Sequence, residues 1–314
     1  MEKVILDCDP GHDDALAIML AVASPELEVL GITTVAGNQT LEKTTRNALR
    51  VLSLIRASVP VAPGAAGPLV RELVIAPEVH GETGLDGAEL PEPAASPLEV
   101  HAVEFIATAL EGSSEPVTLI PTGPLTNIAL LLALHPELKE KIQRIVLMGG
   151  GVRDFNVTPA AEFNIYVDPE AAKIVFHSGV PITMVGLDAT NRALLSPEDI
   201  EAIRRMGGPV SRVLGDLLRF YSRANERLLG IPGAPLHDPL AVATVIDPSL
   251  VRTKSLHVDV ETQGELTRGE TVVDLYGVTG KSANAQVVLD LDLPRFKELI
   301  FAAIRELDER VQEG

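Results

Sequence analysis

Short apolar segments alternate with amphipathic segments from the N-terminus to about residue 190. The apolar segments are rich in Val, Ile and Leu, and most of them end at Gly, Asp or Asn before a helical periodicity begins. Buried strands that alternate with helices are typical of a mostly parallel sheet with helices on both faces. The segments that we predict to be strands in this region are residues 4–6, 27–35, 59–61, 117–120, 145–148 and 182–185.

The C-terminal part of the chain departs from this alternation. A long helical pattern is followed by three strand-like segments, which we expect to form a hairpin-like addition, and by an amphipathic closing helix. No internal repeat or linker divides the chain, so one domain is predicted over residues 1–314. The predicted fold is α/β, with an open, mostly parallel, Rossmann-like sheet and additional C-terminal strands and helices. The C-terminal segments are helices 196–229 and 292–311 and strands 256–260, 270–275 and 286–291.

The first strand ends in a group of carboxylates, Asp7, Asp9, Asp13 and Asp14, with a Pro-Gly turn among them. In open α/β sheets, ligands bind beyond the carboxyl ends of the strands. Like charges this close repel one another, and this segment has no Lys or Arg after Lys3. A hard divalent cation is the simplest compensation. Solvated turn residues and a helix N-cap would account for one or two of these aspartates, but not for all four.

Other motifs with Asp-x-Asp fit this segment less well. An EF-hand loop counted from Asp7 needs Gly at its sixth place and Glu at its twelfth, where the chain has His12 and Ile18. Haloacid-dehalogenase phosphatases also have Asp-x-Asp after a strand, but the Pro-Gly turn and the pair of adjacent aspartates have no counterpart in their pattern. No Gly-x-Gly-x-x-Gly follows the first strand and no Walker loop is present, so a dinucleotide site is not indicated.

Polar residues at other predicted junctions have a structural explanation when each is taken alone. Asn38 fits a helix N-cap, and His237-Asp238 at the start of a buried helix would more often be a cap than a catalytic pair. Residues 63–97 are rich in Gly, Pro, Ala and Glu, and we expect them to form a functional or flexible loop. His80 lies in this loop, which could form a flap over the crevice.

Composition narrows the classes of partner. The net charge of -18 argues against nonspecific binding to nucleic acid and against attachment to anionic membranes. With 46% apolar and 3% aromatic residues, the core must be built from Leu, Val, Ile and Ala. The single cysteine, Cys8, excludes an intramolecular disulfide and suits a reducing compartment. Neither a signal peptide nor a run of transmembrane length is recognisable, so we expect a cytoplasmic protein.

The polar residues at the strand ends belong to a series of short motifs. They are Asp7-x-Asp9-x-Gly11-x-Asp13-Asp14-Ala15, Ala36-Gly37-Asn38, Thr122-Gly123-Pro124-Leu-Thr-Asn127, Met148-Gly-Gly, Glu162-Phe-Asn164 and Pro235-Leu-His237-Asp238-Pro239. In this order and over nearly the whole chain, the series resembles the inosine–uridine preferring nucleoside N-ribohydrolases. The resemblance implies the nucleoside hydrolase fold and hydrolysis of the N-glycosidic bond of ribonucleosides. The products would be ribose and a free purine or pyrimidine base, as in nucleoside salvage.

The resemblance also implies a cofactor, a tightly bound Ca²⁺. Asp9, Asp14, Asp238 and the carbonyl oxygen of Thr122 match its protein ligands. Waters and the 2′ and 3′ hydroxyls of the ribose would complete the coordination of the cation. Asp9 also resembles the general base that takes a proton from the attacking water, which the cation activates.

The same resemblance implies contacts to the substrate. His237 matches the catalytic residue beside the leaving base, and His80 matches a histidine found there in members that favour pyrimidines. Tyr221 and Arg223 lie near the end of a predicted helix, where they either reach the base or serve packing and the surface. The residues that match the ribose-binding group are Asp13, Asn38, Asn156, Glu162 and Asn164, with the carbonyl of Met148 nearby.

The chemistry of such a reaction accounts for these residue types independently. Breaking an N-glycosidic bond builds positive charge on the ribose, which carboxylates stabilise. Attack by water on the face opposite the base would invert the anomeric centre, as in inverting glycosidases. A histidine can protonate the departing base near neutral pH. Because a negative site would reject phosphate groups, nucleosides are predicted as substrates over nucleotides.

Two functions of other classes remain as alternatives. A non-catalytic protein that binds a ribosyl ligand would be indicated by loss of Asp9 or of a metal ligand, and none is lost. A metal-dependent phosphatase would need a basic phosphate-binding residue near the motif, and none is evident. The preferred base is open between purine, pyrimidine and modified nucleosides, and the two histidines favour pyrimidine or mixed use. Members of the family are commonly homodimers or homotetramers, so a homo-oligomer is expected.

Overall fold

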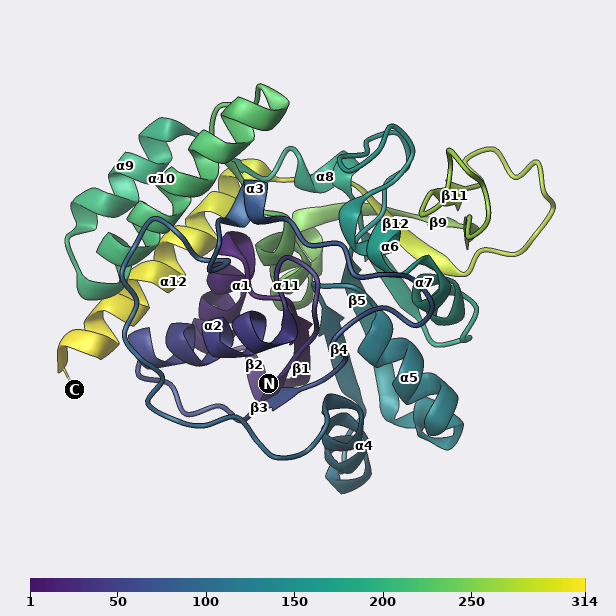
Figure 1. Cartoon of the computed structure of the whole chain (residues 1–314), viewed down its shortest axis with the longest axis horizontal. Coiled ribbons are helices and arrows are strands. Elements are labelled where there is room, and N and C mark those ends of the chain that lie inside the picture. The colour runs from purple at the N-terminus through teal and green to yellow at the C-terminus, as the bar shows by residue number, and fades with distance from the viewer. Residues whose placement is uncertain (314) are drawn as a thin grey trace.

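A central sheet organises the molecule, as the computed structural model of residues 1–313 shows (Figure 1). Its strands are β1 (Glu2–Cys8), β2 (Leu27–Thr34), β3 (Val61–Pro63), β4 (Val117–Pro121), β5 (Ile142–Met148), β6 (Ile182–Val185), β9 (Val251–Leu256) and β12 (Ala285–Leu291). The eight strands lie in the order β3-β2-β1-β4-β5-β6-β12-β9. Neighbours are parallel from β3 to β12, and only the edge pair β12–β9 is antiparallel. The predicted open, mostly parallel sheet is confirmed.

The C-terminal strands differ from the hairpin-like addition that we expected. β12 pairs in parallel with β6, with Gln286 opposite Thr183, and β9 pairs with the other side of β12. Both strands therefore extend the main sheet. The other two C-terminal strands, β10 (Val258–Val260) and β11 (Thr271–Val273), form a separate antiparallel ribbon. The expectation was wrong because a local pattern shows that a strand exists but does not show which distant strand it joins.

Helices cover both faces of the sheet, and each face has its own apolar core. They are α1 (His12–Ala23), α2 (Leu41–Leu54), α4 (Ala102–Gly112), α5 (Thr126–Leu134), α7 (Pro169–Phe176), α9 (Pro197–Met206), α10 (Pro209–Leu229), α11 (His237–Ile246) and α12 (Leu293–Glu313). Side chains alternate along β1, so Val4 and Leu6 enter one core and Ile5 enters the other. Helices α4, α5 and α7 supply the core on the Ile5 side. The remaining long helices supply the other core (Figure 1).

The two helices α1 and α11 are buried in the larger core and pack against each other. In α1 every side chain except that of Val22 is buried, which explains why the segment is apolar on all sides. Both helices begin where the parallel strands end. Their first turns therefore meet at the edge of the sheet at which α/β proteins bind ligands.

The start of α1 matters for the site. The apolar helical pattern of the sequence begins at Ala15, but the helix itself begins at His12. The carboxylate of Asp14 accepts a hydrogen bond from the backbone N–H of Gly11 at 3.0 Å and caps the helix. Asp13 and Asp14 therefore belong to the first helical turn rather than to the preceding loop.

Two other boundaries differ from the predictions. The third strand begins at Val61 rather than at residue 59, directly after Pro60, which has no N–H to donate to a neighbouring strand. The helical pattern over 196–229 is divided into α9 and α10 at Gly207, whose φ of 78° is left-handed. Glycine adopts this conformation without strain, so it ends α9 and allows α10 to start in a new direction.

The loop over residues 63–97 is irregular, as expected, except for strand end Pro63 and the short helix α3 (Pro77–His80). α3 lies beside α10 (Figure 1), and the Arg227 side chain of α10 donates to the Glu78 carbonyl at 2.8 Å. None of the described helices is both long and apolar enough to cross a membrane. The remaining short elements are α6 (Phe163–Val167), α8 (Leu187–Thr190), β7 (Leu194–Leu195), β8 (Ala234–Pro235) and the 3-10 turns Pro136–Lys141 and Pro248–Leu250.

Candidate active site

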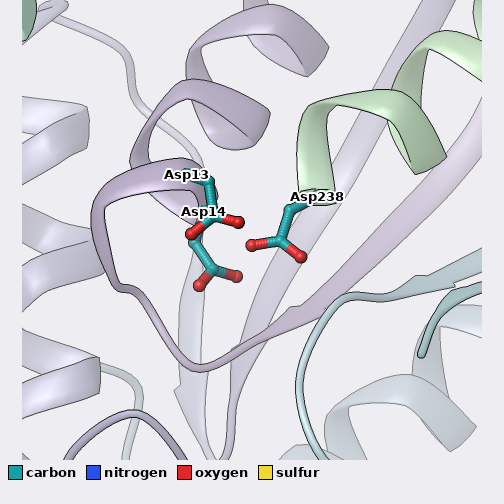
Figure 2. Close-up of side chains that lie close together, drawn as sticks. All are labelled: Asp13, Asp14 and Asp238. Atoms are coloured by element: carbon teal, nitrogen blue, oxygen red, sulfur yellow. The ribbon is translucent and has the colours of Figure 1, made fainter. Parts of the chain in front are cut away.

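Three aspartates converge where α1 and α11 begin. Figure 2 shows the carboxylates of Asp13, Asp14 and Asp238 turned toward one another. Each offers an oxygen within 4.8 Å of the others, and all three side chains are buried. The positive ends of the two helix dipoles offset part of the repulsion among them. The sequence predicted Asp14 and Asp238 as metal ligands and Asp13 as a ribose contact, and the fold brings these two sets together.

Asp9 follows β1 directly and is fully buried. Its Oδ2 accepts a hydrogen bond from the backbone N–H of Asn38 at 2.7 Å, while its Oδ1 has no partner among the described residues. Gly37 and Gly123 lie so close to the carboxylate that a Cβ on either would overlap it. A buried oxygen without a hydrogen bond is costly, so this arrangement indicates a ligand that the chain itself does not supply.

Asp7, the first carboxylate of the sequence motif, does not belong to this cluster. Its side chain lies on the Ile5 face of β1 and accepts hydrogen bonds from Thr33 Oγ1 at 2.6 Å and Asn127 Nδ2 at 2.8 Å. Burial raises the pKa of Asp7 to about 6. The interpretation of four aspartates at one junction is therefore corrected for Asp7, which ties β1 to β2 and α5.

The group of oxygens fits a divalent cation. Burial, followed by repulsion from neighbouring carboxylates, raises the pKa of Asp9 and Asp238 well above the usual range. Among the described residues, no Lys or Arg lines the cavity at this cluster. The Thr122 carbonyl accepts from Asn164 Nδ2 at 2.7 Å and keeps a second lone pair. Carboxylate and carbonyl oxygens are the ligands that Ca²⁺ prefers, so the donor set suits the expected cation.

A cavity of about 330 Å³ adjoins the cluster. Its volume is in the range of sites for small molecules. The fully buried Asp9 and Asp14 lie outside its lining, and all other site residues proposed from the sequence belong to the lining. These are Asp13, Asn38, His80, Thr122, Met148, Asn156, Glu162, Asn164, His237 and Asp238.

One wall of the cavity is built around Glu162 and Asn164, at the start of α6. Glu162 is buried, and its carboxylate accepts from the backbone N–H groups of Gly150 at 2.9 Å and Ile165 at 3.1 Å. Burial raises the pKa of Glu162 to about 7. Asn164 Nδ2 also donates to the Met148 carbonyl at 3.2 Å, so it fixes the ends of β4 and β5 relative to each other.

Asn156 and Asn38 complete the polar lining in different ways. Asn156 is exposed at the rim, and its Oδ1 accepts from the backbone N–H of Phe163 at 3.0 Å. Asn38 Nδ2 donates to the Asp9 carbonyl at 3.2 Å and to Asp14 Oδ2 at 3.3 Å. The N-cap role that we considered for Asn38 is not observed, because α2 begins after Thr40.

Two histidines and a tyrosine also line the cavity. His237 Nδ1 lies 2.8 Å from the Thr190 hydroxyl, and burial lowers the pKa of this imidazole to about 4. His80 and Tyr221 are buried and stack with ring centroids 5.6 Å apart. Burial also lowers the pKa of His80. The lining therefore combines carboxylates with aromatic donors and acceptors.

Some residues in and around the cavity lining were not predicted from the sequence. Asn225 lies one helical turn after Tyr221 and also lines the cavity. Its position as a polar residue on a buried helix face could have indicated this from the sequence. His12 contacts His80, but the irregular loop that carries His80 gave no means of predicting this pair. Tyr221 belongs to the lining, whereas Arg223 is exposed and does not.

Comparison with known proteins agrees with this geometry. The sequence profile of the family described as inosine-uridine preferring nucleoside hydrolase matches residues 4–298. The chain belongs to this family. The resemblance that the motifs indicated is thereby confirmed. The chain is an enzyme, a nucleoside N-ribohydrolase, which cleaves the N-glycosidic bond of ribonucleosides.

Individual members resemble the chain over almost its full length. It is 56% identical over 307 residues to a pyrimidine-specific ribonucleoside hydrolase RihA of Shewanella baltica, with 97% of this chain and 96% of the relative covered. It is 56% identical over 299 residues to the protein of the same name from Escherichia coli, with 95% and 96% covered. Among solved structures, the purine-preferring ribonucleoside hydrolase of Gardnerella vaginalis matches with a TM-score of 0.92 and 37% identity, covering 98% of this chain and 99% of that one.

Proposed function

We propose that this enzyme hydrolyses pyrimidine ribonucleosides to ribose and the free base with the help of a bound Ca²⁺. The observation that carries the calcium dependence is the buried group of carboxylates at the cavity, whose lining has no Lys or Arg in the described part of the chain. The preference for pyrimidines rests on the 56% identity to relatives named as pyrimidine-specific.

The proposed ligands of the cation are Asp9, Asp14, Asp238 and the Thr122 carbonyl. Several anionic and carbonyl oxygens suit Ca²⁺, whereas Mg²⁺ is usually held by one or two carboxylates and several waters. When bound, the cation would polarise a water molecule and the ribose hydroxyls and would neutralise the surrounding carboxylates. Asp13, whose carboxylate lies in the same cluster, is proposed to contact the ribose.

Asp9 is the proposed general base. Its Oδ1 has no hydrogen-bond partner among the described residues and is therefore free to take a proton from the attacking water. Its Oδ2 is fixed by the Asn38 backbone N–H, and two glycines allow the chain to pass closely around it. The carboxylate is thus held in one orientation before substrate binds, which lowers the cost of reaching the transition state.

The ribose is proposed to lie between the acidic cluster and the Glu162 wall. The residues that line this space are Asp13, Asn38, Asn156, Glu162 and Asn164, with the Met148 carbonyl nearby. Positive charge develops on the ribose as the glycosidic bond breaks, and the surrounding carboxylates stabilise that charge more strongly in the transition state than in the substrate.

His237 and His80 are proposed to lie against the base. Both histidines line the same cavity as the carboxylates, so a nucleoside whose ribose lies at the acidic cluster is proposed to place its base against them. Because burial lowers the pKa of His237 to about 4, we propose that it meets the departing base as a neutral imidazole that can form a hydrogen bond to it. Tyr221 lines the same cavity and is also proposed to contact the base.

A substrate panel tests this function. Ribose release would be measured from uridine, cytidine, inosine and adenosine with the purified full-length enzyme. We expect kcat/KM for uridine and cytidine to exceed that for inosine and adenosine by about 10- to 100-fold, the range that pocket contacts supply. Equal or higher values for the purine nucleosides would contradict the pyrimidine preference. Release of ribose only from a modified pyrimidine nucleoside would restrict the proposed substrate to that compound.

A further inference from the structure

The function proposed above leaves His12 without a role, although this residue lies in the opening motif between Gly11 and Asp13. Its side chain is fully buried. The ring stacks with Phe220 and Tyr221, at centroid distances of 5.3 Å and 5.6 Å and interplanar angles of 8° and 4°. A polar ring held this firmly inside the protein indicates a specific task for its nitrogens.

Both nitrogens of His12 have a partner. Nε2 lies 2.8 Å from the backbone carbonyl of Asp86, and Nδ1 lies 3.1 Å from Nδ1 of His80. A carbonyl oxygen only accepts, so Nε2 of His12 carries a proton. The other nitrogen of a neutral imidazole is an acceptor. The short contact between the two rings is a hydrogen bond only if Nδ1 of His80 carries the proton between them.

One further contact competes for the same nitrogen. The backbone N–H of His12 points at Nδ1 of His80 from 3.3 Å and would need that nitrogen as an acceptor. If it were the acceptor, two lone pairs would face each other across the 3.1 Å between the rings. We take the shorter ring contact to decide the position of the proton. The backbone N–H of His12, which is one of the N–H groups of the first helical turn without an intrahelical partner, then makes no hydrogen bond to His80.

The structure holds His80 close to His12 from several sides. A Cβ on Gly11 would lie 2.6 Å from Nδ1 of His80, so a side chain at position 11 would push the ring away. The backbone of His80 is fixed by its N–H bond to the Ala76 carbonyl at 3.1 Å within α3. Because Nδ1 of His80 is engaged with His12, Nε2 is the ring nitrogen of His80 that can contact a ligand in the cavity, which His80 lines.

We propose that His12 is a positioning residue for His80: it accepts the Nδ1–H of His80 and thereby presents the unprotonated Nε2 of that ring to the base of the substrate. This inference rests on the proposed function, because it takes the base to lie against His80. Uracil and cytosine both carry N–H groups that can donate a hydrogen bond to such a nitrogen. A protonated His80 would keep the same bond to His12, so the ring presents Nε2 at the same place in either state.

The position of the proton can be measured without any catalysis. Two-bond ¹H–¹⁵N correlations of the histidine rings would be recorded on the full-length protein, and His80 would be assigned by comparison with His80→Gln. We expect His80 to be the Nδ1–H tautomer in the wild type and to gain the Nε2–H tautomer in His12→Phe, which keeps the stack but has no acceptor. An Nε2–H tautomer of His80 in the wild type would overturn the proposal.

Kinetics with two substrates tests the consequence. The base of uridine carries an N–H group that can donate to Nε2 of His80, whereas the nitrophenyl group of p-nitrophenyl β-D-riboside has no such donor. We expect His12→Phe to lower kcat/KM for uridine by about 10- to 100-fold, the usual effect of losing such an orienting bond. The kcat/KM for the nitrophenyl riboside should change by less than about threefold.

Two further variants separate positioning from packing. His12→Asn places an amide oxygen near the former Nδ1, so it should recover most of the uridine activity. Phe220→Leu loosens the stack but keeps the acceptor, so it should affect both substrates alike. Equal losses on both substrates in His12→Phe would mean a structural role only and would overturn the proposal. If the wild type cleaved the nitrophenyl riboside but no pyrimidine nucleoside, the proposed substrate would fail, while the tautomer measurement would still decide the role of His12.

Discussion

At the scale of single residues, the active-site aspartates oppose folding and favour binding. Asp13, Asp14 and Asp238 hold carboxylate oxygens within 4.8 Å of one another, away from water. Repulsion among such groups is removed when a cation binds, so the metal stabilises the folded state by mass action. The same residues therefore couple the stability of the protein to occupation of its site.

Replacing the proposed general base tests its role directly. Asp9→Asn keeps the shape of the side chain but removes its ability to take a proton, so kcat for uridine should fall by about 100- to 10,000-fold. The free energy of unfolding in chelator should not fall, because a neutral amide removes a buried charge. Glu298→Gln, at an exposed position on α12, is the control and should keep full activity. An unchanged kcat in Asp9→Asn would exclude Asp9 as the base.

Glu162 predicts a pH dependence of stability. Its pKa is raised to about 7 by burial, so the folded protein holds this proton more tightly than the unfolded chain does. Stability from this group is complete below the unfolded pKa of about 4.3 and is lost as pH rises through the folded pKa, a change of at most about 4 kcal/mol. Glu162→Gln imitates the protonated acid at every pH, so in urea the metal-free wild type should lose stability relative to this variant between pH 5 and pH 8. A difference that stays constant over this range would contradict the assignment.

At the scale of secondary-structure elements, a buried polar network fixes the strand ends that carry the site. Asn127 of α5 donates to Asp7 Oδ1 at 2.8 Å and to the Thr34 carbonyl at 3.0 Å. Its Oδ1 accepts from the backbone N–H of Ala65 at 2.9 Å. One side chain thus joins β1, the end of β2 and the start of the long loop.

Removing this side chain should destabilise the protein rather than change its substrate. Asn127→Ala leaves buried partners without hydrogen bonds, and we expect the free energy of unfolding to fall by about 3 kcal/mol. KM for uridine should stay near the wild-type value. Gln143→Ala removes an exposed amide of β5 and should change the stability by less than about 0.5 kcal/mol. If both variants unfolded like the wild type, the network would have no structural importance.

The elements also show what the sequence could predict. The parallel strands and an acidic site after the first strand follow from local periodicity and from the carboxylates around Asp9. The site roles of Asn38 and Asp238 were implied by the resemblance to the family, because each residue taken alone fitted a helix cap. The pairing of β12 with β6 could not be predicted, because it joins segments far apart in the chain without a local signal. Contacts of the irregular loop could not be predicted either, so the pair of His80 and His12 became visible only in the structure.

At the scale of the whole molecule, the net charge of -18 and the absence of Lys and Arg from the cavity lining of the described residues define which ligands can enter. An electronegative cleft attracts cations and repels phosphate groups. The neutral nucleoside therefore suits the site better than the corresponding nucleotide, as the sequence already predicted.

This preference can be measured with one pair of substrates. We expect kcat/KM for uridine 5′-monophosphate to be at least about 100-fold lower than for uridine, which corresponds to about 2.7 kcal/mol. The comparison should be made at constant ionic strength, because salt screens the repulsion. Comparable kcat/KM values for the two compounds would show that the acidic site does not repel the phosphate group, and would contradict the electrostatic argument.

The most direct test of the central claim is uridine hydrolysis before and after removal of the metal. Enzyme would be dialysed against a chelator until elemental analysis finds no bound metal, and ribose release would then be measured with no addition, with Ca²⁺ and with Mg²⁺. We expect activity to disappear on depletion, to return with Ca²⁺ and to return poorly with Mg²⁺, because the site offers several carboxylate and carbonyl oxygens. Full activity in the depleted enzyme would contradict the proposal that the buried aspartates act through a bound cation.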